Sequence, residues 1–85
     1  MIWRVQVSGP AQKSLRKLPA SDQARIRAAL EAMQQDPFSG DIVRLKGQPT
    51  AWRRRVGNYR ILFDVYPQQL LVLVTAIARR TSTTY

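Results

Sequence analysis

The chain has 85 residues, of which fourteen are lysine or arginine and five are acidic, so its formal net charge is +9. A chain of this length forms one small domain, and so positive a charge favours nucleic acid or an acidic protein as partner. The chain lacks cysteine and histidine and its acids are scattered, which argues against disulfides and a metal site, so we expect no metal or other cofactor.

The first half of the chain predicts one strand and two helices. Apolar and polar residues alternate over residues 3–7, which is the period of a half-buried strand. Ser8 is suited to an N-cap and Pro10 to a first helical turn, so a short helix follows. Pro19 interrupts the chain, and a second amphipathic helix is expected over residues 21–36. The two helices should form an antiparallel hairpin that covers one layer.

The second half predicts extended structure. A strand begins at residues 42–45, a turn or bulge follows at 46–49, and residues 51–56 are again extended. Gly57-Asn58 then separates two apolar runs, which is typical of a two-residue hairpin turn of type II′. Residues 59–65 form the return strand.

The last strand is expected over residues 70–77, after a turn at 67–69. Its nearly continuous leucine and valine run is typical of a strand covered on both faces, so we place it centrally, beside the first strand. The chain is therefore predicted to be a single α+β domain over residues 1–85, with the order β-α-α-β-β-β and a three-stranded antiparallel meander. The longest apolar stretch, 70–78, is too short for a membrane helix and the first residues do not resemble a signal peptide, so we expect a soluble, cytoplasmic protein.

The Gly57-Asn58 turn also predicts which side chains share a face of the sheet. In a two-residue hairpin Arg55 lies opposite Arg60, and Arg53 lies opposite Leu62. These three arginines then share one face, whereas the face under the helices receives Trp52, Val56, Tyr59, Ile61 and Phe63. Like charges placed opposite each other destabilise a sheet, so the Arg55–Arg60 pair predicts an anion between them.

More cations follow the last strand, where Arg79 and Arg80 could converge on the same patch. Several guanidinium groups around one phosphodiester would stabilise the additional charge of its transition state. The alternative is that residues 53–55 are a solvated, charged strand that prevents aggregation. Trp3, Trp52 and Phe63 are expected in the core. Lys46 could reach the patch or remain solvated. Tyr85 could stack on a base or transfer a proton, or it could belong to a disordered terminus.

Taken in order, several motifs resemble those of the RelE/ParE toxin superfamily over nearly the whole chain. Residues 11–19 read A-x-K-x-L-x-K-L-P, Asp36-Pro37 closes the second helix, and Leu45-Lys46-Gly47 follows. Residues 52–63, WRRRVGNYRILF, are similar to the family pattern Y-R-x-R-x-G-x-Y-R. Arg79-Arg80 and the terminal Tyr85 resemble the arginine and tyrosine of the family ending.

The resemblance implies a RelE-like sheet of the microbial-ribonuclease type and an acidic or amphipathic antitoxin partner, in a toxin–antitoxin hetero-oligomer. It also implies the toxin of a type II toxin–antitoxin system, acting with the ribosome to cleave mRNA by attack of a 2′-hydroxyl on the adjacent phosphate. Carried over to this chain, the implied catalytic residues are Arg55, Arg60, Arg80 and Tyr85, and the implied RNA-binding residues are Lys46, Arg53 and Arg79. Either Arg79 or Arg80 can match the family's C-terminal arginine.

The chain departs from the family pattern where proton transfer is concerned. Arginine stands at Arg53 and Arg55, where lysine is frequent, and Ala78 replaces a histidine. Arginine keeps its proton, so no residue is an evident general base. Arg54 also stands where an apolar residue is usual, and we expect that end of the strand to lie outside the helical cover. Two alternatives stay open: a ParE-like inhibitor of DNA gyrase, and a degenerate toxin that binds its antitoxin or RNA but cleaves nothing.

Overall fold

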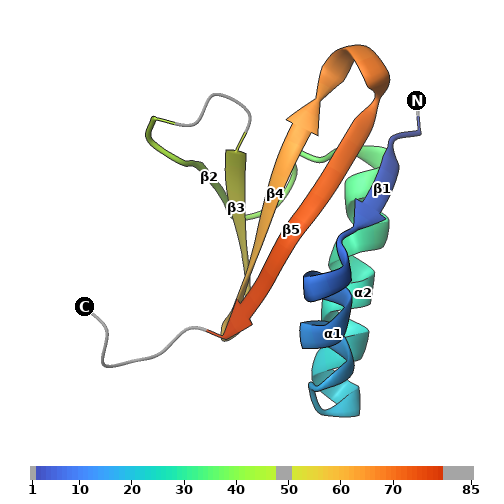
Figure 1. The fold of residues 1–85 in the computed structure, drawn as a ribbon, viewed down its shortest axis with the longest axis vertical. Coiled ribbons are helices and arrows are strands. Elements are labelled where there is room, and N and C mark those ends of the chain that lie inside the picture. The colour runs from blue at the N-terminus through green and yellow to red at the C-terminus, as the bar shows by residue number, and fades with distance from the viewer. Residues whose placement is uncertain (1, 48–50, 80–85) are drawn as a thin grey trace.

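The structure is a computed structural model that describes residues 2–47 and 51–79. These residues form a five-stranded sheet in the order β1-β5-β4-β3-β2, with two α-helices on one face (Figure 1). In chain order the elements are β1 (Arg4–Val7), α1 (Gly9–Arg16), α2 (Ala20–Gln35), β2 (Ile42–Arg44), β3 (Ala51–Val56), β4 (Tyr59–Tyr66), the 3-10 turn η1 (Pro67–Gln69) and β5 (Leu71–Arg79). The expected α+β fold is confirmed.

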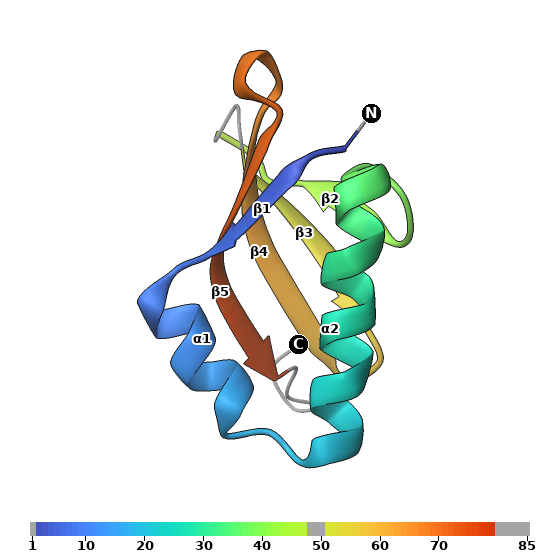
Figure 2. The same cartoon turned by 90° about the vertical axis from the view of Figure 1, so that its right-hand side faces the viewer.

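The first strand lies beside the last, as predicted. β1 runs parallel to β5, with Val5 opposite Val72 and Val7 opposite Val74. The remaining neighbours in the sheet are antiparallel. Because β1 and β2 occupy opposite edges, the helical hairpin carries the chain from one edge of the sheet to the other (Figure 2).

The meander has one strand more than predicted. Residues 42–44 and 51–56 form separate antiparallel strands, β2 and β3, and the amide of Leu45 donates to the carbonyl of Ala51 at 3.0 Å. Gly47, in the segment between them, has a φ of +73°, which glycine adopts more readily than any other residue. The chain therefore reverses direction between β2 and β3, so of the two predicted alternatives, a turn or a bulge, the turn is correct.

Local hydrogen bonds set the bounds of the two helices. The hydroxyl of Ser8 accepts from the amide of Ala11 at 3.3 Å, which confirms the predicted N-cap of α1. The side-chain amide of Gln23 donates to the carbonyl of Leu18 at 2.9 Å and so stabilises the turn between the helices. α2 starts one residue earlier than predicted and ends at Gln35, before Asp36.

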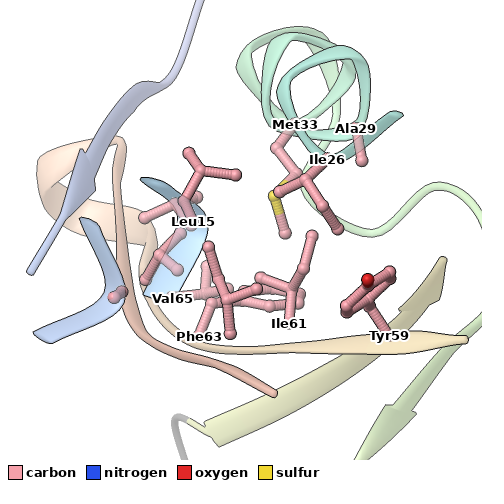
Figure 3. Packing of buried hydrophobic residues seen from close by; sticks show 12 residues of the cluster. Leu15, Ile26, Ala29, Met33, Tyr59, Ile61, Phe63 and Val65 are labelled. Atoms are coloured by element: carbon pink, nitrogen blue, oxygen red, sulfur yellow. The ribbon is translucent and has the colours of Figure 1, made fainter. Parts of the chain in front are cut away.

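The core lies between the helices and one face of the sheet (Figure 3). Every second residue of β4 points into it, and Phe63 is 1% exposed. The buried set comprises Ala11, Leu15, Ile26, Ala29, Met33, Tyr59, Ile61, Phe63, Val65, Val72, Val74 and Ile77. Burying each large apolar side chain contributes about 1.5–3 kcal/mol. The contact between the helical layer and the sheet is therefore the main source of stability.

Two of the three aromatic residues expected in the core lie at its margin instead. Phe63 is buried as predicted, but Trp3 and Trp52 are only partly buried and pack against the core cluster. Phe38 stands between them, with ring centroids 6.3 Å from Trp3 and 5.2 Å from Trp52 in edge-to-face geometry. Phe38 is 43% exposed, so this aromatic group closes the end of the core next to solvent.

The expected cover on both faces of the last strand is wrong. β5 is central in the sheet, as predicted, but the helices cover only one of its faces. Val72 and Val74 are fully buried, whereas Leu71 and Leu73 on the other face are partly exposed. We call the face away from the helices the open face. Neither of the described helices is both long and apolar enough to cross a membrane.

A bulge in β5 changes which residues reach the open face. Phe63 pairs with Val74 and Leu62 with Ala76, so Thr75 is an additional residue, and its hydroxyl donates to the carbonyl of Leu62 at 3.2 Å. One additional residue inverts the alternation of side chains along the strand. From this point Ala76 and Ala78 belong to the open face.

Candidate functional site

The predicted register of the β3–β4 hairpin is confirmed, and it places three arginines on the open face. Arg55 lies opposite Arg60 and Arg53 lies opposite Leu62. Gly57 has a φ of +57°, and Leu70 is the one non-glycine residue with positive φ in the described ranges, so Asn58 follows with negative φ. This is the type II′ geometry that fixes the register of a two-residue hairpin.

A transverse row of side chains crosses the open face through Arg55. Asp41 pairs with Arg55, whose amide donates to the carbonyl of Asp41 at 2.9 Å. Arg60 lies on the other side of Arg55, and Ala78 of β5 lies beyond Arg60. We call Asp41, Arg55, Arg60 and Ala78 the arginine row. Ala78 has the smallest side chain of the four, so the side chains at the β5 end of the row project less from the sheet than the arginines do.

Asp41 supplies a negative charge beside Arg55 that the hairpin register alone does not predict. Its carboxylate lies 3.1 Å from Nε of Arg55, with 49% of the Arg55 side chain and 58% of the Asp41 side chain exposed. The expectation that an anion lies between the opposed arginines is therefore incomplete, because Asp41 already compensates part of their charge. One carboxylate beside two guanidinium groups still leaves the row with a net charge of about +1.

Arg53 and Lys46 extend the positive surface away from this row. Arg53 is partly buried on β3, between Val43 of β2 and Leu62 of β4. Lys46 is exposed and lies in the turn that leads out of β2, towards the opposite end of β3 from Arg55. The structure thus brings Arg53, Arg55 and Arg60 onto one face, whereas Lys46 lies about 13 Å or more from Arg55 along the strand direction.

Arg79 does not join these arginines, and the expectation that it does is wrong. The bulge at Thr75 turns Arg79 to the helix side, where it pairs with Tyr59. The hydroxyl of Tyr59 donates to the carboxylate of Asp22 at 2.8 Å. This hydrogen bond, then burial and the charge of Asp22, raise the pKa of Tyr59, while the charge of Arg79 opposes the shift. Arg80 and Tyr85 lie outside the described residues.

Arg54 has a structural contact that the sequence did not indicate. It lies on the helix side of β3, and its guanidinium donates to the carbonyl of Ala29 in α2 at 3.5 Å. A Cβ at Gly40, whose φ is +83°, would lie 2.9 Å from the same guanidinium. The expectation that this end of the strand lies outside the helical cover is wrong, because Arg54 reaches the second helix.

A second surface feature is a groove between the two helices and β1. Its volume is about 430 Å³, and its lining includes Val5, Val7, Leu15, Leu30, Arg16 and Arg27. Apolar side chains with two arginines form a surface that suits an amphipathic acidic peptide. The side-chain amide of Gln12 donates to the carbonyl of Val7 at 2.8 Å at this edge strand.

Acidic side chains do not gather on either surface. Within residues 2–47 and 51–79, no three carboxylates or other ligand side chains lie close enough together to hold a metal ion. The described part of the open face therefore offers guanidinium groups, with the carboxylate of Asp41 beside Arg55 and that of Asp64 further along β4.

Comparisons with known proteins agree with this geometry. The chain is 28% identical over 83 residues to the RelE1 protein of Methanocaldococcus jannaschii, covering 94% of this chain and 92% of that protein. The toxin in the crystal structure of the archaeal RelE–RelB complex from Pyrococcus horikoshii superimposes with a TM-score of 0.85 at 22% identity, covering 98% of this chain and 100% of that chain.

The isolated RelE toxin of E. coli also has this fold, with a TM-score of 0.82 at 18% identity, covering 96% of this chain and 88% of that chain. Residues 5–83 match the family model described as the ParE toxin of the type II toxin–antitoxin system parDE. The match spans both helices and all the described strands except the first residue of β1. The chain belongs to this family of type II toxin–antitoxin toxins.

Proposed function

We propose that this toxin is RelE-like in activity and cleaves mRNA on the ribosome, without a metal or cofactor. The observation that carries the proposal is the pair of opposed arginines, Arg55 and Arg60, on a sheet face that the helices leave uncovered. Two cations fixed opposite each other suit a phosphodiester between them, and the net charge of +9 favours binding to RNA.

In the proposed reaction, the 2′-hydroxyl of a ribose attacks the adjacent phosphorus and the 5′-oxygen of the next nucleotide leaves, giving a 2′,3′-cyclic phosphate. The proton lost by the 2′-hydroxyl passes to solvent water, and the leaving 5′-oxygen takes a proton from solvent water. Arg55 and Arg60 stabilise the additional negative charge of the pentacoordinate transition state. Arg53 holds a neighbouring phosphate on the same face.

Arg80 and Tyr85 complete the proposed catalytic set on the strength of the family resemblance alone. Lys46 and Arg79 are proposed to bind RNA or ribosome outside the arginine row, because one lies beyond the β2 end and the other lies on the helix side.

A second candidate function is inhibition of DNA gyrase. It is favoured by the family model, which describes a ParE toxin, and by the departures at Arg53, Arg55 and Ala78, which remove an evident general base. A third candidate is a degenerate toxin that binds its antitoxin or RNA and cleaves nothing. In neither case do Arg55 and Arg60 promote cleavage of a phosphodiester bond.

Cleavage of mRNA on programmed ribosomes, measured beside supercoiling of plasmid DNA by gyrase, separates these functions. We expect discrete mRNA fragments ending in cyclic phosphate and unchanged supercoiling. Intact mRNA together with inhibited supercoiling would replace the proposed function by the second candidate. If neither substrate responds while the antitoxin binds, the toxin is degenerate.

We further propose that the toxin acts in the cytoplasm and is neutralised there by an acidic antitoxin, with the groove between the helices and β1 as its docking site. RelE of Pyrococcus horikoshii is found in a complex with RelB, which supports an antitoxin partner. Arg27→Glu at the groove should weaken antitoxin binding at least 10-fold, whereas Lys13→Glu, exposed on α1 outside the groove lining, should have a smaller effect. Equal effects in a calorimetric titration would move the docking site elsewhere.

A further inference from the structure

Asp41 is a carboxylate of the arginine row that the fold places in contact with Arg55. Two of the other four acids have contacts elsewhere: Asp22 accepts from the hydroxyl of Tyr59 on the helix side, and Asp36 accepts from the amide of Phe38 after α2. Asp41 precedes β2 directly and continues its pairing with β3. Its position on the open face is thus set by the strand register.

Two separate contacts join Asp41 to Arg55. The carbonyl of Asp41 accepts from the amide of Arg55 at 2.9 Å, and its carboxylate lies 3.1 Å from Nε of the same residue. The backbone hydrogen bond holds the main chain of Asp41 beside that of Arg55. The side-chain contact therefore starts from a Cα whose position is already set by the strand pairing. A guanidinium has five N–H donors, and the Nε contact uses one, which leaves the four on the two Nη atoms for another acceptor.

Asp41 and Arg60 lie on opposite sides of Arg55 in the arginine row, and this arrangement determines which way the Arg55 guanidinium is drawn. The carboxylate attracts the guanidinium from the side away from Arg60. An exposed arginine has many rotamers, and ordering one costs up to about 2 kcal/mol of side-chain entropy. A contact that orders Arg55 before RNA arrives removes part of that cost from the reaction.

We infer that Asp41 is a positioning residue, which holds Arg55 through Nε so that its two Nη groups present themselves to the scissile phosphate. The inference rests on the proposed function, because it assigns Asp41 a part in that same reaction. It requires a hydrogen-bond acceptor at residue 41 and does not require a proton acceptor. Asparagine should therefore replace aspartate, and alanine should not.

The test measures kcat and KM for mRNA cleavage on programmed ribosomes, with a melting curve for each protein. The variants are Asp41→Asn, Asp41→Ala, Arg55→Ala and the double variant Asp41→Ala/Arg55→Ala. Glu31→Gln, exposed on α2 in the helical layer, is the control for removing one negative charge and should leave cleavage unchanged.

We expect Asp41→Ala to lower kcat about 10-fold without raising KM, because a misplaced group weakens the transition state more than it weakens RNA binding. Asp41→Asn should keep most of the wild-type kcat. In the Arg55→Ala background, the additional Asp41→Ala substitution should change kcat by less than about 2-fold, since no guanidinium remains to be positioned.

Three results would overturn the inference while wild-type cleavage stands. If Asp41→Asn is as slow as Asp41→Ala, the carboxylate itself is needed, as for a proton acceptor. If the losses from Asp41→Ala and Arg55→Ala multiply, Asp41 acts independently of Arg55. If Asp41→Ala cuts at the wild-type rate, the ion pair is only a surface contact. A wild-type protein that cuts no mRNA would instead overturn the proposed function, and this inference with it.

Discussion

Neighbouring arginines on the two faces of the sheet stand in opposite physical settings. Arg54 lies on the helix side, is partly buried and donates to the carbonyl of Ala29. Arg55, the next residue, lies on the open face, is exposed and pairs with Asp41. Because the side chains of a strand alternate, every second residue of β3 can contribute to stability while the residues between them contribute to function.

The largest expected effect is on the helix side, at Phe63. Phe63→Ala should lower the free energy of unfolding by about 3–5 kcal/mol, because the ring is fully buried beneath the helices and its loss leaves a cavity. Urea unfolding followed by circular dichroism measures the change. A Phe63→Ala protein that remains as stable as wild type but cuts no mRNA would show that this residue takes part in cleavage. It would contradict the assignment of stability to the helix side of the sheet and cleavage to the open face.

The next effect is on the open face, at Arg60. Arg60→Ala should lower the rate of mRNA cleavage about 10²–10³-fold, the usual result of removing one preorganised charge-stabilising group, and should change the melting temperature little. Because Arg55 would act on the same phosphate, the double variant with Arg55→Ala should lose less than the product of the single losses. An Arg60→Ala protein that cuts at the wild-type rate would remove the arginine pair from the mechanism.

A smaller loss of stability is expected at the margin of the core. Trp52→Ala should lower the free energy of unfolding by about 1–3 kcal/mol, less than Phe63→Ala, because Trp52 is only partly buried and one face of its cluster, at Phe38, meets solvent. Parallel urea titrations of the two variants make the comparison. Equal losses would show that the aromatic group is as much a part of the core as Phe63.

The smallest effect concerns the hydrogen bond between Tyr59 and Asp22. Tyr59→Phe should lower the free energy of unfolding at neutral pH by less than Trp52→Ala does, because it removes one side-chain hydrogen bond. The pKa of Tyr59 is raised in the folded protein, so its contribution to stability is complete below the ordinary tyrosine pKa of 10.0 and is lost as the pH rises through the higher, folded value. Urea titrations from pH 8 upwards should therefore show wild type losing its advantage over Tyr59→Phe above about pH 10. A constant difference would contradict the hydrogen bond.

The hairpin could be predicted from the sequence because its determinants are local. Gly57-Asn58 fixes a two-residue turn, and the turn fixes the register of every pair from Val56–Tyr59 to Trp52–Phe63. The N-cap at Ser8 is local in the same sense. The site residues on β3 and β4 could therefore be assigned to a face without a structure.

What the sequence missed depends on contacts between distant segments. The bulge at Thr75 lies in a nearly continuous apolar run, where no alternation reveals a change of face, so the sequence predicts Arg79 on the wrong face. The pairing of Asp41 with Arg55 depends on β2 being a separate strand. The contact of Arg54 with Ala29 depends on where α2 crosses the sheet.

The most direct test compares Arg54→Ala with Arg55→Ala, because the two substitutions are chemically identical and one residue apart. Each protein is assayed for mRNA cleavage on programmed ribosomes, per folded molecule, and for its melting temperature. We predict that Arg54→Ala melts earlier and cuts at nearly the wild-type rate, and that Arg55→Ala melts within a few degrees of wild type and cuts about 10²-fold more slowly or worse. The reverse pattern, or equal losses of cleavage in both, would contradict the assignment of stability to one face and catalysis to the other.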